Sequence, residues 1–319
     1  MANRLDNGRD RLDEAARAGW LYYVAGNTQE EIAAKLGISR QTAQRLVSLA
    51  RTEGLIKVRL DHPIAKCLDL SAKLKSRFAL DLVEVSPSDP GSTSTTTGVA
   101  EAAAGEIERR LKSPEPIIMA VGTGRTLKAA IEQITPMECP QHKVVSLTGN
   151  IAPDGSASYY SVIFDLADVV KARSFPMPLP VIASSVEERN LLHSQAVVRS
   201  TLALAAKASV TLVGIGDLGP NAPLYEDGFI TKDELKALQK VGAVGEIVGW
   251  AFDRHGQLIK GLTNDRVASA KIPSRETSLV VALAKGTKKT PGILAAVSRR
   301  LVNGLITDEL TAQALLQTR

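Results

Sequence analysis

The sequence predicts an α/β protein in which an N-terminal helix-turn-helix domain, mostly α, precedes a doubly wound domain with a mostly parallel sheet. The length of 319 residues corresponds to about two domains at roughly 150 residues each. Two capped helices separated by a glycine turn lie within residues 28–52, and after residue 98 short apolar segments alternate with helix-like stretches. We expect domains over residues 1–60 and 61–319, with a linker helix and the first strand over 61–85.

Composition excludes several classes of protein. The nine apolar residue types make up 44% of the chain and the charged types 23%, as in ordinary globular proteins. No apolar run approaches the ~18 residues of a membrane-spanning helix, and the charged N-terminus lacks the apolar core of a signal peptide. Cys67 and Cys139 form no CxxC pair and the four histidines lie far apart, so we expect no metal, no cofactor and a reducing, cytoplasmic location.

The first two helices are predicted from apolar spacing and from the residues at their ends. Residues 10–26 place apolar side chains at helical spacing. Thr28 and Glu31 form a capping box, in which the hydroxyl and the carboxylate satisfy free backbone N–H groups, for a short helix over 29–36. Gly37 ends this helix, because glycine readily adopts the left-handed conformation.

A third helix is predicted from Ser39, which caps it, to about residue 52. Gly54 ends it, and residues 55–60 alternate like a short strand. The expected inward face of the helix consists of Ala43, Leu46, Val47 and Ala50.

A helix, a turn containing glycine and a second capped helix are typical of a DNA-binding helix-turn-helix. The alternative is a three-helix interaction module with the same packing. Charge favours DNA, because residues 39–59 carry five basic residues against Glu53 alone. The third helix is expected in the major groove, where Arg pairs with guanine and Gln with adenine. The candidate DNA contacts are Thr28, Ser39, Arg40, Gln41, Thr42, Gln44, Arg45 and Arg51, with Lys57 as a further phosphate contact. Of Tyr22 and Tyr23, one is expected in the core and the other near the DNA backbone.

The larger domain is predicted from alternating apolar and helix-like segments. A helix over 65–78 and an apolar run over 80–85 open it, and a loop rich in Ser, Thr, Pro and Gly follows over 86–98. Further strands are expected at 116–121, 143–147, 169–173, 210–214, 246–252 and 277–284. Further helices are expected at 99–111, 126–134, 185–207, 232–241, 291–301 and 307–316.

Polar, glycine-rich turns follow several of these strands, at the edge of a parallel sheet where ligands bind. In the turn Gly122, Thr123, Gly124, Arg125 and Thr126, backbone N–H groups, a helix N-terminus and a guanidinium favour an anion. The alternative is a plain strand-to-helix turn. Thr148, Gly149 and Asn150 follow the next strand. A loop with three lysines over 285–289 either faces a bound anion or is solvated surface.

Residues 214–219 match the pattern GxGxxG. A dinucleotide fingerprint needs a helix that opens on this loop, but Pro220 and Pro223 follow at once. Asp217 is therefore interpreted as an acceptor for the hydroxyls of a small ligand, with a turn-stabilising role as the alternative.

Together these motifs resemble the SorC family of bacterial transcriptional regulators over nearly the whole chain. The resemblance is carried by YYVAGNTQEEIAAKLGISRQTAQRLVSLARTEGLI, RFALDLVEVSPS, VGTGRTL, SLTGN, VGIGD, GAVGEIVGWAFDRHG, and ALAKGTKK followed by GLITDELTAQALL. It implies a helix-turn-helix and an effector-binding domain related in fold to sugar-phosphate isomerases and glucosamine-6-phosphate deaminase. Members bind sugars, sugar phosphates or polyols and typically act as tetramers that control catabolic operons.

The resemblance also implies roles for single residues. The turn over 122–126 would hold a phosphate or the equivalent end of the effector, residues 148–150 would line the pocket, and Asp217 would take hydroxyls. Lys289 matches the lysine of the family's GGxxK motif, whereas Lys285 stands where the first glycine is usual and would crowd the loop. Regulators of sugar-alcohol operons look similar, so a polyol such as sorbitol or erythritol is one option.

The sequence therefore predicts a DNA-binding regulator, a repressor of a carbohydrate or polyol operon. Its expected partners are double-stranded operator DNA, a sugar, sugar phosphate or polyol, and copies of itself in a tetramer, with no membrane. Effector binding is expected to shift subunit packing through the linker helix and so to re-space the recognition helices. The alternative is an enzyme resembling the sugar-phosphate isomerases and deaminases, for which Asp217 is the only evident general base.

Overall fold

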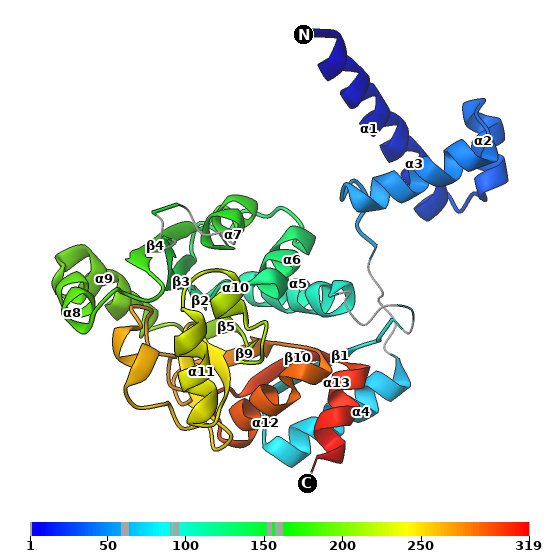
Figure 1. Ribbon diagram of the computed structural model, residues 1–319. Coiled ribbons are helices and arrows are strands. Elements are labelled where there is room, and N and C mark those ends of the chain that lie inside the picture. Colours follow the sequence, from blue (N-terminus) through cyan, green and yellow to red (C-terminus); the bar gives the residue numbers. More distant parts are fainter. Residues whose placement is uncertain are drawn as a thin grey trace. The chain divides into compact units, whose positions relative to one another are not determined.

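The computed structural model describes residues 2–58, 64–89, 91, 96–151, 155–156 and 162–318, with side chains from residue 10 onward except at 150. The chain divides into two compact units, Met1–His62 and Pro63–Arg319. Both units are drawn in Figure 1.

The N-terminal unit consists of α1 (Ala2–Tyr23), α2 (Gln29–Leu36) and α3 (Arg40–Thr52). The three predicted helices are confirmed, although α1 begins before residue 10. Gly19 lets α1 approach α3 closely, since a Cβ there would lie 2.8 Å from the Cβ of Ala50. The buried core contains the predicted inward face of α3 and comprises Ala15, Ala18, Ile32, Ala33, Ala43, Leu46, Val47 and Ala50.

Two expectations for this unit are wrong. Residues 55–58 form no strand, because the N–H groups of Leu55 and Ile56 both donate to the carbonyl of Ala50 and close the end of α3; residues 59–60 lie outside the described part. Tyr22 and Tyr23 are both exposed, at 38% and 36%, so neither belongs to the core. Ala15 and Ala18 of α1 belong to the core instead. The rings of Tyr22 and Tyr23 pack on each other with centroids 4.9 Å apart.

The C-terminal unit is built on a seven-stranded sheet in which all neighbouring strands are parallel, which confirms the predicted fold class. The strand order is β1-β10-β9-β5-β2-β3-β4. The strands are β1 (Leu82–Ser86), β2 (Ile118–Val121), β3 (Lys143–Ile151), β4 (Arg173–Pro180), β5 (Val210–Gly214), β9 (Leu279–Leu283) and β10 (Gly304–Asp308).

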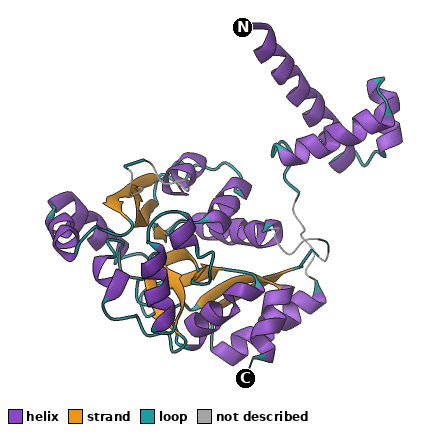
Figure 2. Ribbon diagram, viewed as in Figure 1, coloured by secondary structure: helices purple, strands orange, loops and turns teal. Residues whose placement is uncertain are grey.

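Helices cover both faces of this sheet (Figure 2). One core joins the strands to α5 (Thr97–Leu111), α6 (Arg125–Gln133) and α7 (Val162–Val170). The other joins them to α4 (Ala65–Phe78), α9 (Ala196–Ala205), α12 (Thr290–Ser298) and α13 (Glu309–Gln317). In β2, Met119 and Val121 enter the first core and Ala120 enters the second, as the alternation of a strand requires. The remaining helices are α8 (Val186–Ser194), α10 (Pro223–Glu226), α11 (Lys232–Lys240) and the 3₁₀ turns η1 (Leu262–Arg266) and η2 (Thr287–Lys289).

A small antiparallel sheet replaces the single strand expected over 246–252. It comprises β6 (Gly216–Asp217), β7 (Ala243–Ile247) and β8 (Trp250–Asp253), in the order β6-β7-β8. The chain reverses at Val248 and Gly249, which both have positive φ, at 48° and 90°. A two-residue hairpin loop favours this backbone because it matches the twist of the flanking strands.

Three further expectations are corrected. The strand expected at 169–173 begins only at Arg173, as β4, because residues 169 and 170 still belong to α7. The three prolines of β4 are tolerated because β4 lies at the sheet edge. Residues 185–207 form two helices, since Gln195 adopts an extended conformation between α8 and α9. The expected helix over 307–316 is preceded by the unpredicted strand β10 and begins at Glu309.

Candidate functional site

The ends of the two helix-turn-helix helices are fixed by side-chain caps. The backbone N–H of Thr28 donates to Glu31 Oε2 at 2.7 Å, and the N–H of Glu31 donates to Thr28 Oγ1 at 3.3 Å, which confirms the capping box. Ser39 Oγ accepts from the N–H of Thr42 at 3.1 Å, and the two hydroxyl oxygens are 2.8 Å apart. Gly37 between the helices has a φ of 65°, in the left-handed region.

α3 presents its polar residues to solvent. Arg40 forms an ion pair with Glu30 of α2, with Nη1 and Oε1 3.3 Å apart and side chains that are 68% and 74% exposed. Such a surface pair contributes only about 0–1 kcal/mol of stability. The Arg40 side chain can therefore leave Glu30 at little cost in free energy. All eight candidate DNA contacts are exposed: Thr28, Ser39, Arg40, Gln41, Thr42, Gln44, Arg45 and Arg51.

In the C-terminal unit, a cavity of about 230 Å³ lies at the carboxyl ends of the parallel strands. β2 and β5 are neighbours in the sheet, and the chain continues from them toward opposite edges. This is the switch point at which open parallel sheets bind ligands. Residues 148–150, expected to follow a strand, instead lie within β3, because that strand extends to Ile151. The cavity is lined by the turn after β2, by β3, by the end of β5 with β6, and by η2 after β9, which supply Thr123, Gly124, Arg125, Thr126, Thr148, Gly214, Gly216, Asp217 and Lys289.

Two of the residues predicted for this pocket, Gly122 and Gly149, are not among the described residues that line it. A Cβ on Gly122 would meet Val248 Cγ1 at 3.0 Å, so this glycine makes room for the β7–β8 turn. A Cβ on Gly149 would lie 1.9 Å from the carbonyl oxygen of Leu179, so this glycine lets β3 and β4 approach each other. The side chain of Asn150 lies outside the described residues.

A carboxylate that sequence reasoning missed lies opposite Lys289. Glu246 lines the cavity from β7, and its Oε2 accepts the N–H of Gly249 at 2.8 Å. Burial raises the pKa of Glu246, against the hydrogen bond from Gly249 and the charge of Lys289. Burial likewise lowers the pKa of Lys289, against the charges of Glu246 and Asp217. The one signal in the sequence is an acidic residue inside the apolar run VGEIVGW.

A second missed carboxylate lies near Arg125. Asp227 ends α10 and lines the cavity, together with Asn221 and Phe229 from the same loop. Burial raises the pKa of Asp227, and the charge of Arg125 opposes this shift. Each of the two cations among the described lining residues, Arg125 and Lys289, therefore has a carboxylate acting on it.

Asp217 combines both roles considered for it. Its Oδ1 accepts the N–H of Gly219 at 3.0 Å, which stabilises the turn, and the residue also lines the cavity. Lys285 does not line the cavity: its ammonium lies 3.4 Å from Asp308 Oδ2, with the two side chains only 10% and 6% exposed. The crowding expected from Lys285 therefore does not occur at the cavity.

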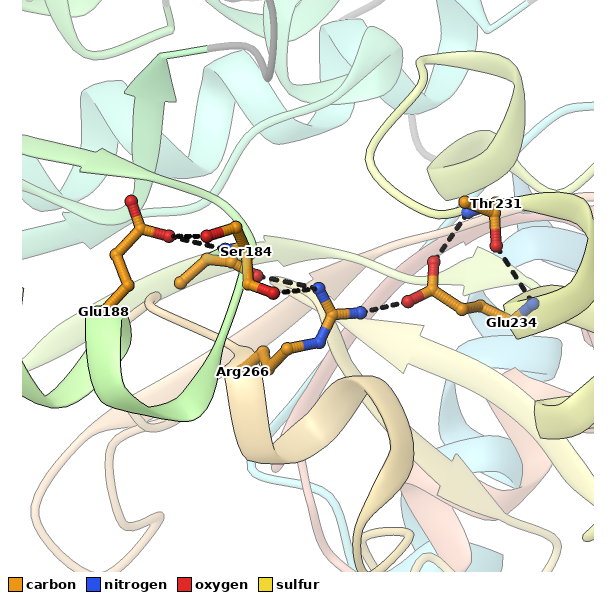
Figure 3. A network of polar contacts seen from close by, with 6 residues as sticks. Ser184, Glu188, Thr231, Glu234 and Arg266 are labelled. Atoms are coloured by element: carbon orange, nitrogen blue, oxygen red, sulfur yellow. Dashed lines mark hydrogen bonds and ion pairs between the residues drawn. The ribbon is translucent and has the colours of Figure 1, made fainter.

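A polar network holds the segment after β4 against η1 and α11 (Figure 3). Arg266 Nη1 donates to the carbonyl of Ala183 at 2.8 Å, while Nη2 donates to Glu234. Glu188 accepts from both the N–H and the hydroxyl of Ser184. This network fixes the neighbourhood of Val181, which lines the cavity.

No group of three or more His, Cys, Asp or Glu side chains in the described part of the chain could hold a metal ion. Cys67 and Cys139 are free and buried. No helix among the described residues is long and apolar enough to span a bilayer.

Two family models match the chain. A putative sugar-binding domain matches residues 62–317, and a homeodomain-like domain matches residues 11–59. The chain is 32% identical over 302 residues to the erythritol catabolism regulatory protein EryD of Brucella abortus, which covers 95% of this chain and 96% of that protein. It is 31% identical over 316 residues to the transcriptional regulator LsrR of an Enterobacter species, covering 94% and 92%.

Solved structures share the fold. The full-length sorbitol operon regulator SorC from Klebsiella pneumoniae matches with a TM-score of 0.72 at 24% identity, over 97% of this chain and 100% of that one. A putative sugar-binding domain of a transcriptional repressor from Vibrio fischeri matches with a TM-score of 0.69 at 25% identity, over 78% and 98%.

Proposed function

Because the chain belongs to the SorC-type family of sugar-binding transcriptional regulators, we propose that it represses a carbohydrate or polyol operon in the cytoplasm and responds to a ligand in the strand-end cavity. Its relatives over more than nine-tenths of the chain are regulators, so the chain is a DNA-binding regulator and the alternative of an isomerase-like enzyme falls. The observation that carries the proposed effector site is the meeting of polar residues from β3, β6, η2 and the turn after β2 at the switch point of the sheet.

For DNA, we propose that α3 enters the major groove. Gln44 and Arg45 are exposed on it and have the side chains that pair with adenine and guanine. Arg51, near the end of the helix, is exposed and suits a phosphate. Ser39 and Thr42 keep their cap while presenting exposed hydroxyls.

For the effector, we propose that Asp217 and Lys289 hold hydroxyls or an anionic group, and that the turn over 122–126 closes on the other end of the ligand. The names of two similar proteins refer to erythritol catabolism and to a sorbitol operon, which favours a polyol. Gly122 and Gly149 act in this proposal by making room for neighbouring backbone rather than by touching the ligand.

For coupling, we propose a homotetramer in which the effector changes subunit packing. The linker helix α4 is tied to the chain terminus, because Arg77 Nη1 donates to the carbonyl of Leu316 at 2.6 Å and Nη2 donates to that of Thr318. A shift at this anchor would re-space recognition helices, whose half-sites must lie about 34–36 Å apart or a multiple of that distance.

The test is thermal unfolding of the full-length chain with a panel of polyols, free sugars and sugar phosphates. A ligand at a hundredfold excess over its Kd adds about 2.7 kcal/mol of stability. We expect at least one member to raise the midpoint, and the Asp217→Asn variant to lose that response. Light scattering before and after ligand reports the oligomer. If the responding ligand still raises the midpoint of Asp217→Asn unchanged, it binds elsewhere and the effector site is misplaced.

A further inference from the structure

We propose that a second cavity, separate from the effector site, binds an anion with two or more phosphoryl groups. Its volume is about 550 Å³, within the range of about 300–1,000 Å³ that is typical of small-molecule sites. It lies at the amino ends of β1 and β10, since Ala79 and Arg300 line it and shortly precede these two paired strands. The effector site lies at the opposite, carboxyl ends, and the described lining residues of the two cavities do not overlap.

The lining of this second cavity is strongly cationic. It includes four arginines and one histidine: Arg77, Arg254, Arg299, Arg300 and His255. They come from the end of α4, the turn after β8 and the end of α12, which are far apart in the sequence. No carboxylate is among the described lining residues, and none of the four arginines forms an ion pair in the described part of the chain. Because guanidinium groups stay protonated in proteins, this cluster keeps its positive charge.

The helix ends offset only part of this charge. α4 and α12 both end at the cavity, and each helix C-terminus is equivalent to about half a negative charge, so the two offset about one of four guanidinium charges. Asp253 lies beside the turn, but its Oδ1 accepts the N–H groups of His255 and Gln257 at 2.8 and 2.9 Å and so holds the turn in shape. The remaining charge favours an anion with several negative charges, and guanidinium groups pair with phosphoryl oxygens through two parallel hydrogen bonds.

His255 lies between two arginines that can only donate hydrogen bonds. Arg254 Nε donates to His255 Nε2 at 3.2 Å, so the proton of the neutral ring is on Nδ1. This Nδ1 lies 3.5 Å from Arg299 Nη2, so two donors face each other. The other tautomer moves the same conflict to Arg254, and a protonated ring would oppose both guanidinium groups. An anionic oxygen at this point would accept from the imidazole and the guanidinium together.

The backbone brings these arginines to the cavity. Gly256 has a φ of 65°, and a Cβ on it would lie 2.5 Å from the Cβ of Arg299, so this glycine lets Arg299 approach the turn after β8. Arg300 follows the end of α12 with a φ of 61°, at a position where helices favour glycine. Arg77 is held by the carbonyls of Leu316 and Thr318, which fix its position without removing its charge. The chain therefore keeps an arginine at position 300 against the preference of the backbone.

The experiment measures pyrophosphate binding to the full-length chain by calorimetry, without divalent cations. We expect one equivalent to bind, and orthophosphate to bind more weakly. Arg254→Gln and Arg299→Gln should each weaken pyrophosphate binding at least about tenfold, because a hydrogen bond between charged groups contributes about that much. Arg199→Gln is the matched control, since Arg199 is an exposed arginine of α9 that is not among the described lining residues.

Arg300→Gly separates binding from folding. Glycine adopts the positive φ without strain, so this variant should melt no lower than the unaltered chain while it binds pyrophosphate at least about tenfold more weakly. An unaltered chain that binds no pyrophosphate would overturn the proposal, as would full affinity in Arg254→Gln, Arg299→Gln and Arg300→Gly. Binding that is lost in Arg125→Ala and kept in Arg254→Gln would place the anion in the effector cavity and would also overturn it.

Tripolyphosphate and ATP distinguish two sources of this chemistry. Equal affinities for both would identify the phosphate chain alone as the ligand, and tighter binding of ATP would identify a nucleotide. Either result supports the proposal, whereas failure of both to bind would overturn it. These measurements use neither DNA nor an effector, so their outcome is independent of the regulatory proposal.

Discussion

Gly216 and Glu246 face each other across the β6–β7 pair, and a Cβ on Gly216 would lie 2.0 Å from Glu246 Oε1. Gly216 is the second glycine of the GxGxxG match. In a dinucleotide fold that glycine makes room for a pyrophosphate, whereas here it makes room for a carboxylate. The pattern therefore has a steric origin within the chain itself.

Gly216→Ala should displace Glu246 and break its hydrogen bond with Gly249. We expect a loss of about 1–3 kcal/mol in unfolding free energy, together with weaker effector binding. Gly214→Ala is the control for the unfolding free energy alone, since a Cβ there meets only the carbonyl of Thr123 at an ordinary 3.6 Å. The double variant Gly216→Ala/Glu246→Ala should lose less than the sum of the single variants. Additive losses in urea titrations would show that the two residues do not interact.

Gly149→Ala should unfold the C-terminal unit rather than weaken ligand contacts. The new methyl group would meet the backbone of Leu179, which cannot move without breaking the β3–β4 pair. We expect a loss above about 4 kcal/mol, as for the most disruptive substitutions. Gly105→Ala in α5 is the matched control, because a Cβ there meets nothing within 4 Å and alanine favours a helix by about 1 kcal/mol. Equal melting temperatures of the two variants would contradict this account.

Arg45→Ala should weaken operator binding by about 1–3 kcal/mol and relax specificity at one base pair. Arg51→Ala should instead weaken binding to all DNA sequences alike. Because one phosphate contact is lost, the slope of log K against the logarithm of salt concentration should fall in magnitude by about one. Arg199→Ala removes an exposed arginine of α9 in the other unit and should change neither quantity. Fluorescence anisotropy at several salt concentrations separates these results. If Arg199→Ala weakened operator binding as much as Arg45→Ala, the proposal that α3 contacts the DNA would be contradicted.

Asp308→Asn should cost stability at neutral pH, by about 1–3 kcal/mol. Burial alone would raise the pKa of Asp308, but hydrogen bonds from Thr311 and the charge of Lys285 outweigh it and lower the pKa. A carboxyl whose pKa is lower in the folded state stabilises the fold above its unfolded pKa of about 3.9. The difference in unfolding free energy between the unaltered chain and Asp308→Asn should therefore be full at pH 6–8. It should shrink as the pH falls through the pKa that Asp308 has in the folded state. Urea unfolding at pH 7 and pH 3.5 checks this. A stability difference that grows toward acid pH would show that folding raises the pKa of Asp308, which contradicts the account.

Local signals made the helix-turn-helix predictable. Thr28, Glu31, Gly37 and Ser39 fix the ends of α2 and α3 through contacts within four residues, so both helices begin and end where the sequence predicts. The parallel sheet followed from alternation alone. The strand β4 did not, because three prolines argue against a strand unless its edge position is known.

The cavity was predictable only in part. Glycine composition indicated the turns after β2 and β5, and Thr148 and Asp217 were predicted from their places near the ends of expected strands. Lys289 was singled out through the resemblance. Glu246 and Asp227 were missed, since their importance depends on long-range neighbours. Lys289 lies 43 positions after Glu246 in the sequence. The turn between β7 and β8 was also hard to predict, because Val248 has a positive φ, which β-branched residues rarely adopt.

The most direct test measures the Kd of the full-length chain for DNA from its own promoter region, with and without the ligand that raises its melting temperature. We expect the ligand to weaken binding by about 5–150-fold, the range of a coupling of 1–3 kcal/mol. Asp217→Asn should bind the same DNA with the unaltered Kd and lose the ligand response. A ligand that occupies the cavity and leaves the Kd unchanged would contradict the account.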